Sequence, residues 1–286
     1  MRVIIATDLS EASLAAVDSV TACSPVDFSA VALVHAVELD LYTGGGTVPA
    51  ILELAEERLG QIAAHLRDAG FDANVRAEVG PAVEVIERVA AEEEADLVVM
   101  TNLGKGAVSG RLLGSTAERL ASAGTLPVLI ERVREDAGAW CRIGDGQPFS
   151  RVLVGTDLSD SFPAQLAVVG NLPDLGEVRV VHVADADTDT DALIGDLTTL
   201  ATEALPGTRV ETVVRTDDDP AEGLLAEAEE WGATIITVSP RRHGMLHRAI
   251  WGSTARRIAK ESPIPVLFVP AGDKLSARAS STSRSE

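Results

Sequence analysis

The residues of this chain that could hold a phosphate lie in a loop that reads TNLGKGAVSGRLLGST. The loop joins a continuous apolar stretch, 96–101, to a segment of helical character that begins at Ser115. Gly104 and Gly114 allow the backbone to approach a phosphate closely, and the first N–H groups of a helix point toward it with the positive end of the dipole. Ser115 and Thr116 add hydroxyl donors. The loop is therefore a candidate anion site, although an ordinary turn with Ser115 as N-cap would use the same residues.

The elements that must position this loop occur twice. VIIATDLS at 3–10 returns as VLVGTDLS at 152–159, and GSTAERLA at 114–121 returns as GSTARRIA at 252–259. An internal repeat of this length indicates two similar domains. In each copy, continuous apolar runs alternate with segments of helical periodicity, which is typical of a parallel sheet covered on both faces. We therefore predict two tandem doubly wound, Rossmann-like α/β domains.

The offsets between the copies set the predicted boundaries. We expect domain 1 at residues 1–133, a linker rich in glycine and charge at 134–150, and domain 2 at 151–270. The tail 271–286 has the composition of a disordered segment. The second copy is about nine residues shorter than the first, chiefly in the helix that follows its second strand.

The composition argues against several classes of partner. The chain has 44 acidic and 24 basic residues, a formal charge of −20, so its surface repels nucleic acid and anionic lipid. Its apolar runs are too short to span a bilayer, and no signal-peptide pattern opens the sequence, so we expect an acidic cytoplasmic protein. The two cysteines, Cys23 and Cys141, form no close-spaced pair and receive no functional role.

The doubled TDLS and GST segments resemble the universal stress protein family, in its tandem form, over nearly all of residues 1–270. Many members of that family bind ATP through G-x2-G-x9-G-[ST] on an adenine nucleotide alpha hydrolase-like fold. An Asp after the first strand lies near the nucleoside, and a backbone position at the end of the second strand meets the base. In domain 1 the resemblance implies a site made of Thr7, Asp8, Ala36, Thr101, Gly104, Gly114, Ser115 and Thr116. Thr101 departs from the motif, because a β-branched residue stands where the family has its first glycine.

Domain 2 departs further from the family pattern. The corresponding positions are Asp157, Val183, Arg242, Gly252, Ser253 and Thr254. Ser239 and Arg242 replace both loop glycines. Two hypotheses remain open: Arg241 and Arg242 hold phosphates by charge, or the pocket is vestigial and its residues are structural. We favour the vestigial hypothesis.

Other residues of suitable type are better explained by structure. His243 and His247 are four residues apart, but they lie in a loop with no third ligand nearby, so no metal site is predicted. His35 and His182 recur inside buried strands, where we expect hydrogen-bonded core histidines. Glycines 44–46 are not followed by G-K-[ST], so they do not form a Walker loop.

The resemblance implies a regulatory stress-response protein that binds ATP or another adenine nucleotide, with Mg²⁺ as an accompanying ion, mainly in domain 1. No residue near the loop is an obvious general base, so we expect no enzyme activity beyond slow ATP hydrolysis. The alternative is a nucleotide-free dimeric scaffold, since the fold alone does not define the function. An enzyme of adenylate chemistry is a third hypothesis, disfavoured because no catalytic motif accompanies the loop.

Assembly is also implied by the resemblance. Universal stress proteins typically dimerise through their last strand. In this chain 126–130 of one copy could then pair with 264–268 of the other, which would give an intrachain pseudo-dimer. Whether two chains form a homodimer is left open by the sequence.

Overall fold

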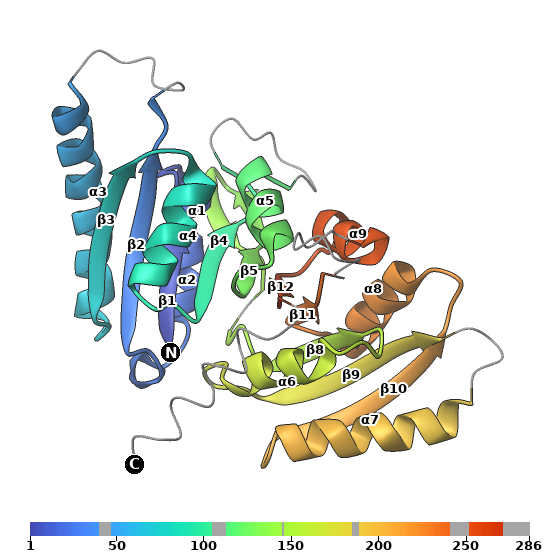
Figure 1. Cartoon of the computed structure of the whole chain (residues 1–286). Coiled ribbons are helices and arrows are strands. Elements are labelled where there is room, and N and C mark those ends of the chain that lie inside the picture. The colour runs from blue at the N-terminus through green and yellow to red at the C-terminus, as the bar shows by residue number, and fades with distance from the viewer. Residues whose placement is uncertain (40–46, 105–112, 145, 185–188, 241–251, 271–286) are drawn as a thin grey trace. The chain divides into compact units, whose positions relative to one another are not determined.

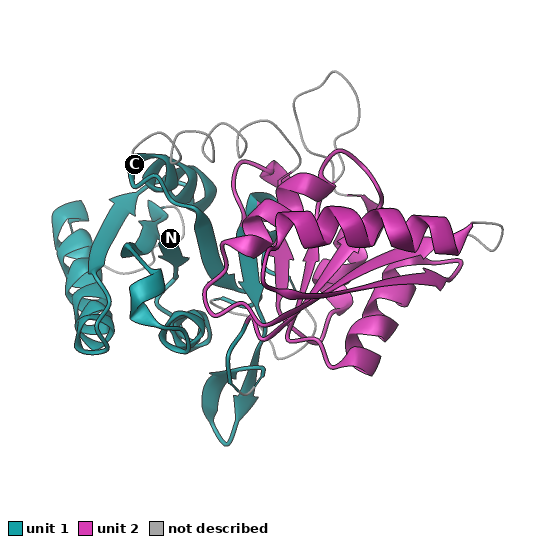
Figure 2. Cartoon of the chain, turned by 90° about the horizontal axis from the view of Figure 1, so that it is seen from below, with its two compact units in different colours: residues 1–120, 128–148 teal, residues 121–127, 149–286 magenta. Residues whose placement is uncertain are grey.

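The computed structural model describes most of the chain, namely residues 1–39, 47–104, 113–144, 146–184, 189–240 and 252–270. It divides into two compact units, which Figure 2 shows in different colours. Unit 1 comprises Met1–Leu120 and Val128–Pro148, and unit 2 comprises Ala121–Pro127 and Phe149–Glu286. The two units are described separately below.

Strands of unit 1 pair in parallel in the order β3-β2-β1-β4-β5. Their bounds are β1 Arg2–Ala6, β2 Ala30–Val37, β3 Ala73–Val79, β4 Leu97–Thr101 and β5 Val128–Glu131. β4 is buried along its whole length, as its unbroken apolar sequence predicts for a strand covered on both faces. The helices that pack around these strands are α1 Glu11–Leu14, α2 Ala16–Thr21, α3 Val48–Asp68, α4 Ala82–Glu92 and α5 Ser115–Ala123 (Figure 1). A short 3₁₀ turn spans Pro25–Asp27.

Unit 2 repeats the arrangement, with strand order β10-β9-β8-β11-β12. Its strands are β8 Arg151–Thr156, β9 Glu177–Ala184, β10 Arg209–Thr216, β11 Ile235–Val238 and β12 Val266–Phe268. Its helices are α6 Phe162–Gly170, α7 Thr190–Ala204, α8 Pro220–Trp231 and α9 Ser253–Glu261. The predicted doubly wound α/β fold in two tandem copies is confirmed. The predicted shortening is also found, since α7 has 15 residues where α3 has 21.

One element was not predicted. Part of the stretch assigned as a linker forms an antiparallel hairpin of β6 Val133–Asp136 and β7 Ala139–Arg142. Ala137 and Gly138 both have positive φ, as a tight two-residue hairpin turn requires. Val133 is buried in a cluster with residues of α1, and Trp140 packs against that cluster. The hairpin is therefore anchored to unit 1 through Val133 and Trp140, while the rest of β6 is exposed.

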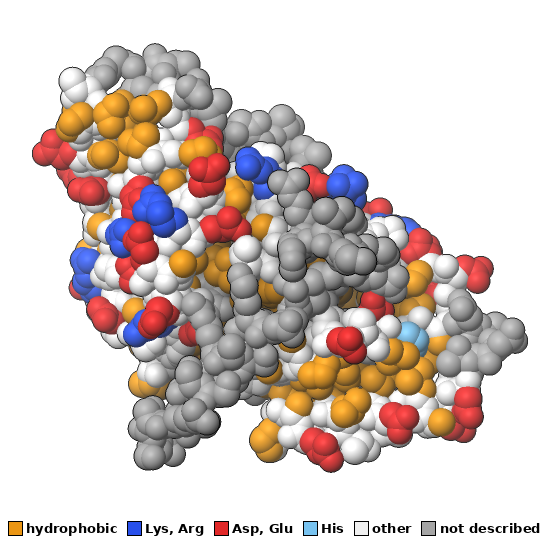
Figure 3. All heavy atoms as spheres, viewed as in Figure 1, with side chains coloured by type: hydrophobic (Ala, Val, Ile, Leu, Met, Phe, Trp, Pro, Cys, Tyr) orange, Lys and Arg blue, Asp and Glu red, His pale blue; other side chains and the backbone are white. Residues whose placement is uncertain are grey.

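Acidic side chains are spread over the face of the molecule seen in Figure 3, interspersed with Lys and Arg, and do not form one patch there. Among the helices of the described part of the chain, none combines the length and apolar character that a bilayer span requires.

Candidate functional site

The predicted site lies where the strand order of unit 1 reverses. β1 has β2 on one side and β4 on the other, so the connections leave β1 in opposite directions along the sheet. In open parallel sheets, ligands bind beyond the carboxyl ends of the strands at such a switch point. β1 and β4 are parallel neighbours (Figure 1), so Thr7 and Asp8, which follow β1, lie at the same edge of the sheet as Thr101, which ends β4.

The turn after β1 orients the Asp8 carboxylate. Leu9 has φ 63, a backbone conformation unusual for a residue with a side chain. Two hydrogen bonds hold it: Leu9 N donates to Thr7 Oγ1 at 2.9 Å, and Ser10 N donates to Asp8 Oδ1 at 2.9 Å. The Ser10 hydroxyl also donates to Asp8 Oδ1, at 2.5 Å. Asp8 is therefore a fixed, half-buried acceptor.

Gly104 meets this carboxylate directly. A Cβ atom built on Gly104 would lie 2.5 Å from Asp8 Oδ2 and 3.4 Å from Asp8 Cγ. Real Cβ contacts do not approach so closely, so a side chain at position 104 would force the Asp8 carboxylate or the backbone to shift. The structure thus brings together two residues that the sequence analysis assigned to the same site from different segments.

Asn102, which the sequence analysis did not single out, closes the loop. It is buried, and its carbonyl oxygen accepts a hydrogen bond of 2.9 Å from Gly114 N. Its own N–H donates to Glu131 O at 2.9 Å, and its Oδ1 accepts from Val133 N at 3.2 Å. These bonds hold the start of α5 against the end of β4. A lone asparagine directly after a buried strand was the only signal in the sequence.

The phosphate-binding positions stand at the start of α5. Glu118 N donates to Gly114 O at 2.9 Å, so the helix begins at Ser115 as predicted. The N–H groups of a first helical turn have no partner within the helix, and they carry the positive end of its dipole. Ser115 is exposed and Thr116 is half-buried. This helix start can accept an anion.

Thr101 has a structural contact of its own. Its side chain is buried, and its hydroxyl donates to Leu103 O at 2.6 Å. The hydroxyl that replaces the first glycine of the family motif therefore shapes the turn after β4.

β2 contributes a backbone position and a buried histidine. Ala36 is half-buried near the end of the strand, opposite Glu78 of β3. Its neighbour His35 forms a hydrogen bond of 2.8 Å between Nδ1 and Thr7 O. His182 makes the same contact with Thr156 O in unit 2, at 2.9 Å. Both histidines are hydrogen-bonded, as predicted, but only His35 is a buried core residue, since His182 is half-buried.

Unit 2 keeps the turn after its first strand. Leu158 has φ 62, Leu158 N donates to Thr156 Oγ1 at 3.0 Å, and Ser159 N donates to Asp157 Oδ1 at 3.1 Å. Asp157 is exposed, however, whereas Asp8 is half-buried. The side chain of Val183 packs against Gly223 of α8, where a Cβ would lie 3.0 Å from Val183 Cγ2.

The helix start of unit 2 is also conserved in form. Gly252 precedes α9 in an extended conformation, and its carbonyl accepts from Arg256 N at 3.1 Å. Ser253 is exposed and Thr254 is half-buried, as at the start of α5. Arg242, with the rest of 241–251, lies outside the described residues.

The histidine pair considered as metal ligands and the glycines compared with a Walker loop both lie outside the described residues. His243 and His247 fall within 241–251, and glycines 44–46 likewise lie outside the described residues. In the part of the chain that is described, His, Cys, Asp and Glu side chains form no group of three or more that could hold a metal ion.

The comparisons with known proteins agree with this architecture. The model of the universal stress protein family matches residues 1–132 and again 148–270. The chain is similar to a universal stress protein from Archaeoglobus fulgidus, with 26% identity over 95% of this chain and 97% of that one, and a TM-score of 0.73. A functionally unknown protein from Pseudomonas aeruginosa is 15% identical over 100% of this chain and 97% of its own, with a TM-score of 0.62. A search of curated proteins gives no match.

The fold, whose strand order reverses at β1, defines a doubly wound α/β protein. The chain belongs to the universal stress protein family, as a tandem member with one family domain in each half.

Proposed function

We propose that unit 1 binds an adenine nucleotide, with ATP as the first candidate, at the carboxyl ends of β1 and β4. One observation carries the proposal: the bare backbone of Gly104 lies against the oriented carboxylate of Asp8. A side chain at position 104 would fill this space. The glycine therefore leaves room for a ligand to approach the backbone closely. Family membership supports the same ligand, because domain 1 matches the universal stress protein model and keeps the motif residues Gly104, Gly114 and Ser115.

Each matching position then has a physical role. The α-helical N–H groups after Gly114, with the hydroxyls of Ser115 and Thr116, would receive the phosphates, and Mg²⁺ would accompany them. The Asp8 carboxylate would accept hydrogen bonds from the ribose hydroxyls. The backbone of β2 at Ala36 would meet the base.

We propose one nucleotide site per chain. Position 240 of unit 2 is a proline, which has neither the N–H nor the side-chain amide that Asn102 uses in unit 1. Arg242 stands at the position of Gly104, and the geometry of unit 1 has no space there for a Cβ. These differences support the vestigial hypothesis for domain 2.

The role we propose is regulatory binding without efficient turnover. Asp8 Oδ1 already accepts two hydrogen bonds from Ser10, which suits a fixed acceptor better than a base that must take a proton from water. Nucleotide binding would instead bias the conformation of the protein or its choice of partner.

Isothermal titration calorimetry of the full chain with ATP and Mg²⁺ tests the proposal. We expect one site per chain, with phosphate release slow enough to leave most of the ATP intact over an hour. Two equal sites would contradict the asymmetry between the units. The absence of binding heat at several temperatures would favour the nucleotide-free scaffold.

The repeat also supports a proposal on assembly, the intrachain pairing of the last strands 126–130 and 264–268. A cysteine pair placed on these two strands should form an intrachain disulfide in the monomeric fraction. Crosslinking only between chains would favour a homodimer instead.

A further inference from the structure

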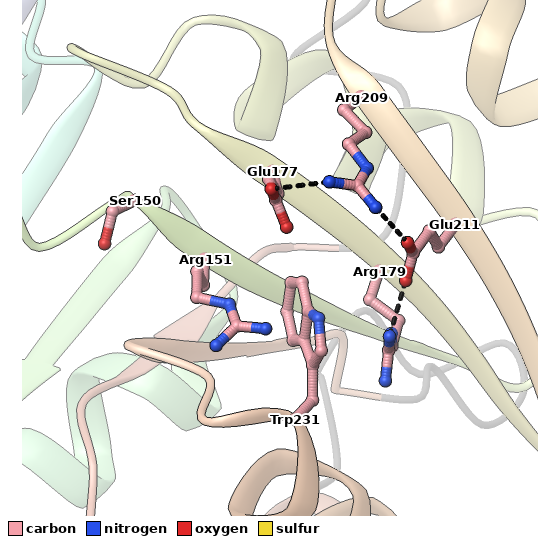
Figure 4. A pocket seen from close by; sticks show the side chains of 7 residues that line it. All are labelled: Ser150, Arg151, Glu177, Arg179, Arg209, Glu211 and Trp231. Atoms are coloured by element: carbon pink, nitrogen blue, oxygen red, sulfur yellow. Dashed lines mark hydrogen bonds and ion pairs between the residues drawn. The ribbon is translucent and has the colours of Figure 1, made fainter.

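Unit 2 has a cavity of about 520 Å³ at the amino ends of its strands, the end of the sheet opposite to Asp157. A volume of this size suits a small molecule. Six of the residues that line it are Arg151, Glu177, Arg179, Arg209, Glu211 and Trp231, as shown in Figure 4.

The strand register places the charged residues on one face of the sheet. Arg151 of β8 lies opposite Glu177 of β9, which lies opposite Arg209 of β10. One step of two residues further, Arg179 lies opposite Glu211. Because side chains two residues apart in a strand share a face, both rows point the same way.

Trp231, at the end of α8, positions two of the guanidinium groups. The Cζ atoms of Arg151 and Arg179 each lie 4.7 Å from its ring. Figure 4 shows the indole between the two arginines. The ring is almost fully buried, so this is a built arrangement and not a chance surface contact.

Most charges of the cavity are paired. Arg179 donates to Glu211 at 2.5 Å and to Glu227 at 2.7 Å, while Arg209 donates to Glu177 at 3.0 Å and to Glu211 at 2.9 Å. The hydrogen bond from Arg179 lowers the pKa of Glu211, so this carboxyl stays ionised at neutral pH.

Arg151 is the exception. Within the described residues, no carboxylate lies within ion-pair distance of its guanidinium, and its buried Nε has no hydrogen-bond partner. Counting Glu227, which pairs with Arg179, three arginines meet three glutamates, and Arg151 is the arginine of the lining whose charge no carboxylate of the described residues balances. An anion is the ligand that this imbalance favours.

In unit 1 the arginine that corresponds to Arg151 has a carboxylate partner. Arg2 begins β1 as Arg151 begins β8, and its Nη1 donates to Glu94 Oε2 at 2.5 Å and to Glu93 O at 3.2 Å. The residue of unit 2 that corresponds to Glu94 is Gly232, also with positive φ and without a carboxylate.

The neighbouring strand has changed as well. Ala30 and Ala32 of β2 occupy the register positions of Glu177 and Arg179. Unit 2 therefore has charged residues where unit 1 has alanines, and it has no carboxylate at the position of Glu94.

We propose that this cavity binds a small oxyanion, a phosphoryl or carboxylate group, through the Arg151 guanidinium. The planar fork of Arg151 is held by Trp231 and would bind two oxygens of the anion side by side. Arg209, with its side chain 66% exposed, lies beside it to contact the rest of the ligand. The site is independent of the proposed nucleotide crevice, since it lies in the other unit and at the other end of its strands.

The test uses the fluorescence of Trp231 in the full chain. Trp140→Phe and Trp251→Phe leave it as the single tryptophan. This protein is titrated with inorganic phosphate and, separately, with citrate, at an ionic strength held constant with sodium chloride. We expect saturable binding of at least one anion. Phosphate alone would identify a phosphoryl ligand, and citrate alone a carboxylate ligand.

The variants locate the site. Arg151→Gln should weaken binding about tenfold or more, because a charge-assisted bidentate contact is lost. Arg151→Lys keeps the charge without the fork and should also bind more weakly than the parent. Arg2→Gln, the matched change in unit 1, and Gly104→Ala, at the nucleotide crevice, should leave the affinity unchanged. A signal that does not saturate with either anion, or that both Arg151 variants retain in full, would overturn the proposal.

Discussion

The Asp8 carboxylate occupies the space that a side chain on residue 104 would need, since a Cβ built on Gly104 would lie 2.5 Å from Asp8 Oδ2. The carboxylate cannot simply turn away, because Ser10 holds its other oxygen with both its N–H and its hydroxyl. Gly104 of the loop after β4 and Asp8 of the turn after β1 are therefore structurally coupled. Changes at either residue should affect the other.

Gly104→Ala should weaken ATP binding by at least about tenfold, since the added Cβ displaces either the loop or the Asp8 carboxylate. Calorimetry with ATP measures the effect. Gly60→Ala is the matched control, because nothing lies within 4 Å of a Cβ at Gly60. If Gly104→Ala bound ATP with wild-type affinity, the close contact between Gly104 and Asp8 would not be part of a nucleotide site.

Gly114→Val should abolish detectable ATP binding in the same assay. Its branched side chain would project at the start of α5, where the phosphates are expected. Gly114→Ala separates bulk from backbone effects, because a Cβ there lies 3.5 Å from Asn102 O, an ordinary contact. We expect the alanine variant to fold normally and to retain part of the affinity. Unchanged binding by the valine variant would place the phosphates elsewhere.

The fold could be predicted because its signals are local. Unbroken apolar strands such as β4 and the doubled TDLS and GST segments define the sheet and its repetition. Asp8, Gly104 and Gly114 could be proposed as site residues from the resemblance to the family motif, since each stands next to a strand or helix end.

What the sequence did not reveal depends on pairing between distant segments. Asn102 matters because it meets Glu131, Val133 and Gly114, and no local pattern records those contacts. The hairpin from Val133 to Arg142 has strands of four residues, the second of them without a fully buried position, so its periodicity is weak.

The cavity of unit 2 was missed for a related reason. Its arginines and glutamates lie on three strands and meet only through the sheet register. In the sequence each of them looks like an ordinary charged residue at the start of a strand.

Asn102→Ala should destabilise unit 1 by about 1–3 kcal/mol, because the Val133 N–H loses its acceptor in a buried position. The same change should weaken ATP binding. Asn102 contacts both Val133 of the hairpin and Gly114 at the start of α5, so losing one contact should disturb the other. Urea unfolding measures the first effect and calorimetry the second. Asn74→Ala, at an exposed position of β3, is the control and should change neither. Equal stability of the two variants would show that the Asn102 side chain is not a structural tie.

Glu131 should make the stability of the protein depend on pH near neutrality. It ends β5, is fully buried, and neither carboxylate oxygen has a hydrogen-bond partner among the described residues. Burial raises the pKa of Glu131 to about 7, and the nearby Ser19 hydroxyl and Arg142 guanidinium offset this only in part. The acidic Asp18 acts in the same direction as burial.

The direction of the effect follows from proton binding. Between pH 4.5, the ordinary pKa of a glutamate, and about pH 7, the folded state retains the proton on Glu131 while the unfolded state has lost it. The contribution of this group to the free energy of unfolding therefore falls as the pH rises through that window, and stays low above it. Glu131→Gln, which remains neutral, should remove the dependence and be more stable than the wild type at pH 8, by up to about 3 kcal/mol.

Urea unfolding of both proteins at intervals between pH 5 and pH 8 measures this difference, and subtracting the two curves removes the titration of all other groups. Glu135→Gln, on an exposed position of β6, is the matched control and should follow the wild type at every pH. Parallel curves for the wild type and Glu131→Gln would mean that Glu131 is ionised and solvated in the folded protein. A widening gain for Glu131→Gln with rising pH would show that the folded protein holds the proton of Glu131 in its core.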